Sequence, residues 1–133
     1  MSGVVDASVA VKWFLDEPES EAAIRVVGAC LDGDPHFVPE LFYYEVVAVL
    51  ARRHPRFPAW CDEGMRWLTE LPLRRFALTP EQTPRLAEFV RAGLTGYDAA
   101  YAALAADLDV PWLTFDRRAA SALGHPDWIK VPG

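Results

Sequence analysis

Short apolar runs alternate with stretches of helical length along the whole chain. The runs predict strands at residues 3–6, 36–38, 73–78, 110–115 and 128–131. The stretches between and after them predict helices at residues 8–15, 18–31, 40–53, 59–71, 84–92, 95–108 and 116–123. Because neighbouring parallel strands need crossover connections, this alternation predicts an α/β fold, a three-layer sandwich in which helices flank a five-stranded parallel sheet.

The length and composition suit one folded unit. The chain has 133 residues, 52% of them hydrophobic, so we expect a single domain over residues 1–133. No run approaches the ~20 consecutive apolar residues of a membrane helix, and the N-terminus lacks the features of a signal peptide. We therefore expect a cytoplasmic protein without membrane contact. Cys30 and Cys61 show no Cys-x-x-Cys spacing and are expected to be reduced.

The formal net charge of −6 argues against a protein that grips phosphate backbones through positive charge alone. Two divalent ions bound to clustered acids would add four positive charges and bring the total to −2. The acidity is therefore compatible with a nucleic-acid substrate if metal ions mediate the contact.

Two acids follow predicted strands directly. Asp6 comes after Val4-Val5, and Asp116 comes after Leu113-Thr114-Phe115. In parallel sheets, ligands bind beyond the carboxyl ends of the strands, which places both acids at the expected site. Each acid could instead cap the helix that follows it, a role that Ser8 could also fill near Asp6.

Glu45 lies on an apolar helix face. At 100° per residue its surface neighbours are apolar, namely Leu41, Phe42, Ala48 and Val49. A buried carboxylate is costly unless it binds a metal, pairs with a base or becomes protonated. No Lys or Arg lies one helical turn away, which favours metal binding.

Asp98 is in a similar position on a later helix. Its neighbours on the same face are Leu94, Tyr101, Ala102 and Ala105. Thr95 followed three residues later by an acid is also the pattern of a helix cap, so Asp98 could serve only the helix N-terminus. The four acids gain their functional interpretation by occurring together.

Other catalytic chemistries lack their sequence patterns. Carboxylate oxygens suit Mg²⁺ or Mn²⁺, and His36, His54 and His125 show no zinc-ligand spacing. The chain has no Gly-x-Ser-x-Gly elbow, and neither phosphate-loop pattern, Gly-x-x-x-x-Gly-Lys-[Ser/Thr] or Gly-x-Gly-x-x-Gly, is present.

Four segments that contain these acids resemble the motifs of PIN-domain proteins, most closely those of VapC-type toxins. The segments are Val5-Asp6-Ala7-Ser8-Val9, Pro39-Glu40-Leu41-Phe42-Tyr43-Tyr44-Glu45-Val46, Thr95-Gly96-Tyr97-Asp98-Ala99-Ala100-Tyr101 and Leu113-Thr114-Phe115-Asp116. They occur in the family's order and cover essentially the whole chain.

The resemblance implies a flavodoxin-like fold and an endoribonuclease that needs Mg²⁺ or Mn²⁺, the toxin of a type II toxin–antitoxin pair. It implies an antitoxin partner and an RNA substrate. The family's catalytic and metal-binding acids match Asp6, Glu45, Asp98 and Asp116, with Asp6 and Asp98 the surest ligands. Ser8 and Thr114 occupy positions where a hydroxyl often supports the acids.

Two arginine pairs flank the expected site. Arg117 and Arg118 directly follow Asp116, and Arg52 and Arg53 end the Glu45 helix. Either pair could hold flanking phosphates, although cations at helix ends also have a purely electrostatic role. We assign Arg117 and Arg118 as the expected RNA-binding residues.

Aromatic residues concentrate in the first and fourth predicted helices and just ahead of the fourth. They are Trp13, Phe14, Phe57, Trp60 and Trp67, and with Leu71 they could form a surface for a homodimer or for an antitoxin helix, or simply pack in the core.

Two other functions remain open at this point. A metal-dependent phosphatase on a similar fold would need a second Asp two residues after the first, where this chain has Ser8. A catalytically inert PIN-like module that binds RNA or protein would be expected to have lost some of the four acids.

Overall fold

The computed structural model describes all 133 residues and contains one five-stranded sheet. Its strands are β1 (Gly3–Val5), β2 (His36–Pro39), β3 (Arg74–Phe76), β4 (Trp112–Leu113) and β5 (Ile129–Lys130). Every neighbouring pair is parallel, and the order across the sheet is β3-β2-β1-β4-β5. The predicted fold class is confirmed.

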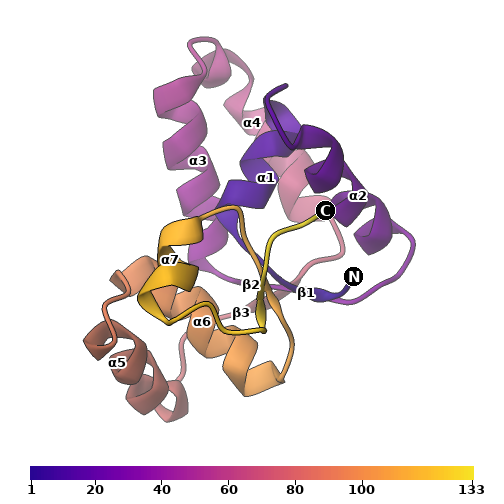
Figure 1. Cartoon of the computed structure of the whole chain (residues 1–133). Helices are drawn as coiled ribbons and strands as arrows, with labels where there is room; N and C mark the ends of the chain where they lie inside the picture. Colours follow the sequence, from indigo (N-terminus) through magenta and orange to yellow (C-terminus); the bar gives the residue numbers. More distant parts are fainter.

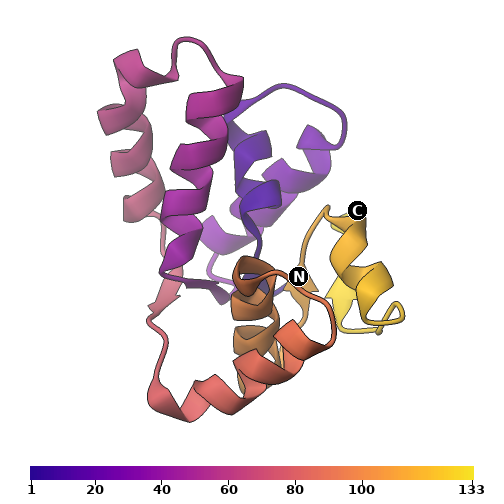
Figure 2. The same ribbon diagram turned by 90° about the vertical axis from the view of Figure 1, so that its left-hand side faces the viewer.

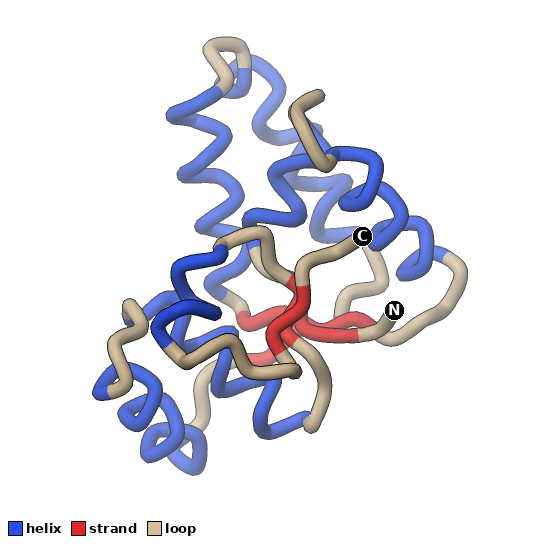
Figure 3. The backbone as a smooth tube through the Cα atoms, in the orientation of Figure 1, coloured by secondary structure: helices blue, strands red, loops and turns tan.

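Seven α-helices and one short 3₁₀ turn, η1 (Pro80–Gln82), connect the strands. The α-helices are α1 (Ala7–Phe14), α2 (Ser20–Leu31), α3 (Leu41–Arg53), α4 (Phe57–Glu70), α5 (Thr83–Arg91), α6 (Gly96–Leu108) and α7 (Arg117–Ala122). In Figures 1 and 3 the sheet lies between a group formed by α1 to α4 and a group that contains α5 and α6. Helix α6 packs on the sheet through β1, β2 and β4, and α5 packs on α6.

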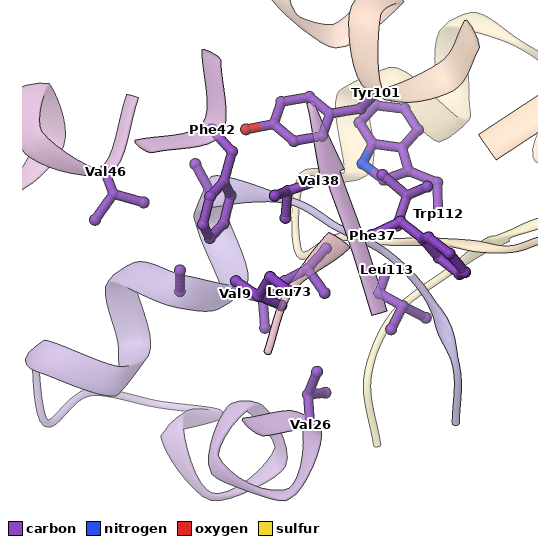
Figure 4. Close-up of a cluster of buried hydrophobic side chains, with 14 of the residues drawn as sticks. Val9, Val26, Phe37, Val38, Phe42, Val46, Leu73, Tyr101, Trp112 and Leu113 are labelled. Atoms are coloured by element: carbon purple, nitrogen blue, oxygen red, sulfur yellow. The ribbon is translucent and has the colours of Figure 1, made fainter. Parts of the chain in front are cut away.

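The centre of the sheet is buried on both faces. All residues of β1 and β2 are buried, as expected for parallel strands covered by helices on both sides. Figure 4 shows the core around Val9, Val38 and Phe42, with the rings of Tyr101 and Trp112 side by side. Those two rings are stacked with centroids 5.9 Å apart.

Strand β1 runs very close to the segment before β4. A Cβ atom on Gly3 would lie 2.5 Å from the carbonyl oxygen of Pro111, a distance that no side chain tolerates. The backbone amide of Val4 donates to that carbonyl over 2.8 Å. Glycine at position 3 is therefore what lets β1 and β4 pair at the centre of the sheet.

Two predicted helix boundaries are wrong. Helix α2 begins at Ser20 rather than Pro18, because Glu19 adopts a left-handed conformation with φ of 72°. Helix α4 begins at Phe57 rather than Ala59, since Pro58 falls in the first turn, where a missing N–H costs nothing. The strands after residue 72 are also shorter than predicted.

The aromatic residues of α1 and α4 pack mainly on one another. Phe14 contacts both Trp60 and Trp67, with ring centroids 6.0 and 5.5 Å apart, and Trp13 contacts Trp67 at 6.2 Å. Trp67 remains 42% exposed. Core packing thus accounts for most of this cluster.

None of the helices combines the length and apolar character needed to cross a membrane.

The chain order of the sheet reverses between β1 and β4. From β1 the chain moves outward through β2 and β3, and it later returns to add β4 and β5 on the other side. Such a reversal leaves a crevice beyond the carboxyl ends of the two strands, because their following loops diverge to opposite faces. Asp6 and Thr114 directly follow β1 and β4 at this point.

Candidate active site

All four predicted acids line one cavity of about 330 Å³ at the β1–β4 crevice. Asp6 enters from the end of β1, Glu45 from the middle of α3, Asp98 from the first turn of α6, and Asp116 from the segment after β4. Their positions in sequence span 110 residues, yet the crossover topology brings them to one edge of the sheet.

Three of the acids sit at helix N-termini, where Asp6 and Asp116 cap α1 and α7, and Asp98 lies in the first turn of α6 behind the cap Thr95. The amide of Ser8 donates to Asp6 Oδ2 over 2.9 Å, and the amide of Arg118 donates to Asp116 Oδ1 over 3.0 Å. In α6 the amide of Asp98 donates to the Thr95 hydroxyl over 3.1 Å. Capping does not compete with a role in the site, because the same three acids line the cavity.

A pair of hydroxyl groups joins the two strand ends. Ser8 Oγ lies 3.3 Å from Thr114 Oγ1 and accepts the amide of Phe115 over 3.0 Å. Thr114 Oγ1 accepts the amide of Asp116 over 2.9 Å. The two supporting residues predicted from sequence therefore hold the loops that carry Asp6 and Asp116 in a fixed relation.

Glu45 differs from the other acids because it carries an unsatisfied atom. Its Oε1 is buried without any hydrogen-bond partner, and the buried hydroxyl of Tyr101 also lacks one. Burial raises the pKa of Glu45 to about 7. The nearby Tyr101 hydroxyl, the next largest influence, lowers this pKa, and the charges of Asp6 and Asp98 raise it. Glu45 is thus close to half-protonated at neutral pH when no cation is bound.

Asp6 and Asp98 are perturbed in the same direction. Burial raises the pKa of Asp6, although hydrogen bonding to Ser8 and the nearness of Thr114 and Trp112 work against that rise. Burial and the charges of Asp6 and Asp116 raise the pKa of Asp98 to about 6. The acids therefore repel one another, and a cation among them would relieve this repulsion.

The donor set fits a hard divalent cation, but its members stand apart. No three Asp, Glu, His or Cys side chains are close enough to hold a metal ion as placed. The available donors are carboxylate oxygens, the ligand type that Mg²⁺ and Mn²⁺ prefer. The unpartnered Glu45 Oε1 is the atom most in need of such a ligand. Small side-chain rotations would have to accompany binding.

The cavity also contains residues that the sequence did not single out. They are Lys12 and Glu17, which line it together with the acids and with Arg52 and Arg53, the second arginine pair noted in the sequence. Lys12 lies four residues after Ser8, so helical spacing on α1 was the available signal.

The predicted RNA-binding pair lies outside this cavity. Arg117 pairs with Glu19 at 3.6 Å, and Arg118, whose side chain is 95% exposed, lies 3.5 Å from Asp116. Their role in RNA binding stays a prediction.

Residues 3–123 match the model of the PIN domain family. The chain belongs to the PIN-domain family. It is 34% identical to "Ribonuclease VapC12" of Mycobacterium tuberculosis over 131 residues, 96% of this chain and 97% of the relative. It is 52% identical to "Ribonuclease VapC1" of the same species over 52 residues, 37% of this chain and 39% of the relative. The resemblance noted in the sequence is confirmed.

Solved structures share the fold at low sequence identity. The crystal structure of Mycobacterium tuberculosis VapC20, described as a sarcin-ricin loop cleaving toxin, superposes with a TM-score of 0.74 at 15% identity and covers both chains fully. A toxin–antitoxin complex from Klebsiella pneumoniae gives 0.66 at 13% identity, covering 98% of both chains. These likenesses support the PIN-type α/β fold.

Proposed function

We propose that this PIN-domain protein is a metal-dependent endoribonuclease of the VapC type, the toxin of a type II toxin–antitoxin pair. One observation carries the proposal: four carboxylates from distant segments meet at the crevice between β1 and β4. The alignment with proteins named ribonucleases over nearly the whole chain supports the same activity.

The proposed cofactor is Mg²⁺ or Mn²⁺, held by Asp6 and Asp98 with Glu45 and Asp116 completing the site. A bound divalent ion supplies an activated water and neutralises charge on the phosphate. The hydroxyl pair of Ser8 and Thr114 keeps the Asp6 and Asp116 loops in place, which spares the site a reorganisation when substrate binds.

The negative charge of the cavity explains why a cation has to bind before the RNA phosphodiester. Its lining contains five acids and three basic residues, which leaves a formal charge of −2. A phosphodiester would be repelled by that charge, whereas one divalent ion brings the lining to zero and two make it positive. The acidity of the chain then becomes compatible with RNA.

The proposed partners are the RNA substrate, a cognate antitoxin and a second copy of the chain. The Klebsiella pneumoniae neighbour is described as part of a toxin–antitoxin complex, which supports an antitoxin here. Exposed Tyr44 and Trp67 offer apolar surface for such contacts. We place the activity in the cytoplasm, where RNA is available. Light scattering with and without the antitoxin tests both assemblies.

The decisive experiment compares RNA cleavage by the parent chain, Asp6→Asn and Asp98→Asn. Each substitution removes a negative ligand with little change in volume, so we expect cleavage to fall by at least about a hundredfold in folded protein. Chelation of divalent ions should have the same effect on the parent.

Asp107→Asn is the matched control, because Asp107 lies on the same helix as Asp98 and pairs with Arg85 outside the cavity. It should cleave like the parent. RNA binding without metal-dependent cleavage would instead favour the inert binding module, and equal cleavage by all variants would reject the proposed site.

A further inference from the structure

Three basic residues form one side of the active-site cavity. Lys12 lies in the last turn of α1, and Arg52 and Arg53 lie in the last turn of α3. Helices α1 and α3 pack against each other, as Figures 1 and 2 show. We call Lys12, Arg52 and Arg53 the cationic wall of the cavity.

The Lys12 ammonium is held in place and retains one free donor. It donates to Glu17 Oε1 over 3.1 Å and to the carbonyl oxygen of Pro18 over 2.8 Å, and it lies 5.0 Å from the ring centroid of Phe115. An ammonium group has three N–H donors. Its side chain is only 12% exposed and lines the cavity, so a ligand inside the cavity can supply an acceptor for the third donor.

Glu17 reduces the electrostatic repulsion between the basic residues of the cationic wall. It pairs with both Lys12 and Arg53. Burial works against its ionisation, yet hydrogen bonds from Arg53 and Lys12 hold the pKa of Glu17 below its usual value. Lys12, Glu17 and Arg53 together therefore carry one net positive charge.

Arg52 differs from its neighbour in having no ion-pair partner. Its side chain is exposed, lines the cavity, and has no acid within ion-pair distance. Arg117 and Arg118, by contrast, pair with Glu19 and Asp116 and do not line the cavity. Of the two arginine pairs, Arg52 and Arg53 are the better placed for a ligand inside the site.

The distance between acids and cations suits a strand of phosphates. Asp6 caps α1 and Lys12 lies in its last turn, six residues later, which corresponds to about 9 Å along the helix axis. A nucleic-acid strand that places one phosphate at the acids therefore carries another toward the cationic wall.

We propose that Lys12 and Arg52 bind an RNA phosphate that flanks the cleaved one, and so position the strand across the acidic side of the cavity. This inference rests on the proposed function, because it assigns the substrate contacts of that same site. Arg53 acts through Glu17 as a positioning residue that holds the wall together.

The test measures binding of a fluorescent single-stranded RNA of about 16 nucleotides across a range of salt concentrations. Asp98→Asn provides a background in which cleavage is blocked, with Mg²⁺ present throughout. Arg52→Gln should weaken binding about threefold to tenfold and reduce the salt-dependence slope by about 0.7, the value for one lost phosphate contact. Lys12→Met should act in the same way.

Matched substitutions distinguish a phosphate contact from a general effect of net charge and from a loss of stability. Arg66→Gln removes the same charge outside the cavity and should leave the slope unchanged, whereas Arg117→Gln tests the separate prediction that Arg117 contacts RNA. Thermal unfolding identifies any variant that loses structure, and Arg52→Gln, at an exposed position, covers the case in which Lys12→Met does not fold. In the cleaving protein, Arg52→Gln should raise KM with little change in kcat.

The inference is overturned if Arg52→Gln leaves the slope and KM unchanged, whether Arg117→Gln reduces them or not. It is also overturned if Arg52→Gln weakens only the binding of a protein partner, which would make the wall a partner surface. A parent chain that does not cleave RNA would instead reject the proposed function itself, so the two failures can be told apart.

Discussion

The two halves of the acidic site are built differently. On the strand side, Asp6 and Asp116 each accept a backbone amide and are linked through Ser8 and Thr114. On the helix side, neither the Glu45 nor the Asp98 carboxylate accepts a backbone amide, and Glu45 Oε1 has no partner at all. The strand side is thus fixed before any ligand arrives, whereas the helix side is left unsatisfied.

Within one site, this difference separates carboxylates that support folding from carboxylates that are left for a ligand. A carboxylate that accepts amide hydrogen bonds repays part of its desolvation cost, and a buried one without donors does not. The helix side therefore lowers the free energy of unfolding of the metal-free protein, and a bound cation would raise it again. Three sets of substitutions test this contrast, beginning with the largest expected effect.

Glu45→Gln should stabilise the metal-free protein at pH 8. The pKa of Glu45 is raised in the folded state to about 7, so the folded protein binds more protons than the unfolded chain between about pH 4 and 7. Stability should consequently fall as pH rises through this window, and the substitution should remove much of that fall. At pH 8 the gain should be about 1–2 kcal/mol, less than the full shift because the side chain is partly open to water.

Chemical unfolding at pH 5 and pH 8 measures this effect. Glu63→Gln, at an exposed position on α4, is the control and should change neither value. With Mg²⁺ the parent should instead be more stable at pH 8 than at pH 5, because the metal competes with protons and binds best at the higher pH. A parent protein more stable at pH 8 than at pH 5 without metal would contradict the assignment.

Ser8→Ala should destabilise the strand side by about 1 kcal/mol, since the Phe115 amide loses its acceptor. Thr114→Val should cost a similar amount through the Asp116 amide. Because the two hydroxyls contact each other, the double variant should cost less than the sum of the single ones. Urea unfolding gives the three values, and Ser121→Ala, on the exposed part of α7, is the control. Strict additivity would show that the hydroxyls act separately.

Tyr101→Phe should have the smallest effect on stability, below about 0.5 kcal/mol, because the buried hydroxyl that it removes has no hydrogen-bond partner. It should nevertheless raise the pKa of Glu45 further, since the hydroxyl, although not within hydrogen-bond geometry, is near enough to the Glu45 carboxyl to lower that pKa in the parent. Carboxyl NMR titration reports this shift, and Tyr97→Phe, exposed at the start of α6, should leave it unchanged. A loss well above 1 kcal/mol would mean that the hydroxyl is hydrogen-bonded in solution.

Local sequence patterns were sufficient to place the acids at the site but insufficient to place the basic residues. Asp6 and Asp116 could be placed because the carboxyl end of a parallel strand is a defined point in the fold. Glu45 could be placed because a helix face has a fixed period. Arg52 belongs to a basic pair at the C-terminal end of a helix and Arg117 to one at an N-terminal end, and neither pattern says which pair lines the cavity. The packing of α1 against α3 decides it.

Helix boundaries also divide into those that local sequence predicts and those that tertiary contacts decide. Most helix boundaries lie within one residue of their predicted positions, because turns rich in Gly and Pro are read from sequence. The start of α2 was missed because it depends on a hydrogen bond from the Ser20 hydroxyl to the Leu15 carbonyl oxygen, 2.9 Å away, together with the left-handed Glu19. Such a contact forms only once α1 and α2 have packed.

The sequence by itself determined the parallel α/β architecture, the family and the four acids, since these depend on hydrophobic periodicity and on residues at strand and helix ends. Tertiary structure alone decided that the halves of the acidic site differ, that Lys12 and Arg52 face the acids, and that Glu45 is left without a partner. The physical reason is that hydrogen bonding and desolvation depend on atoms from segments as far apart as Ser8 and Thr114, whose distance is set by the packing of the whole fold.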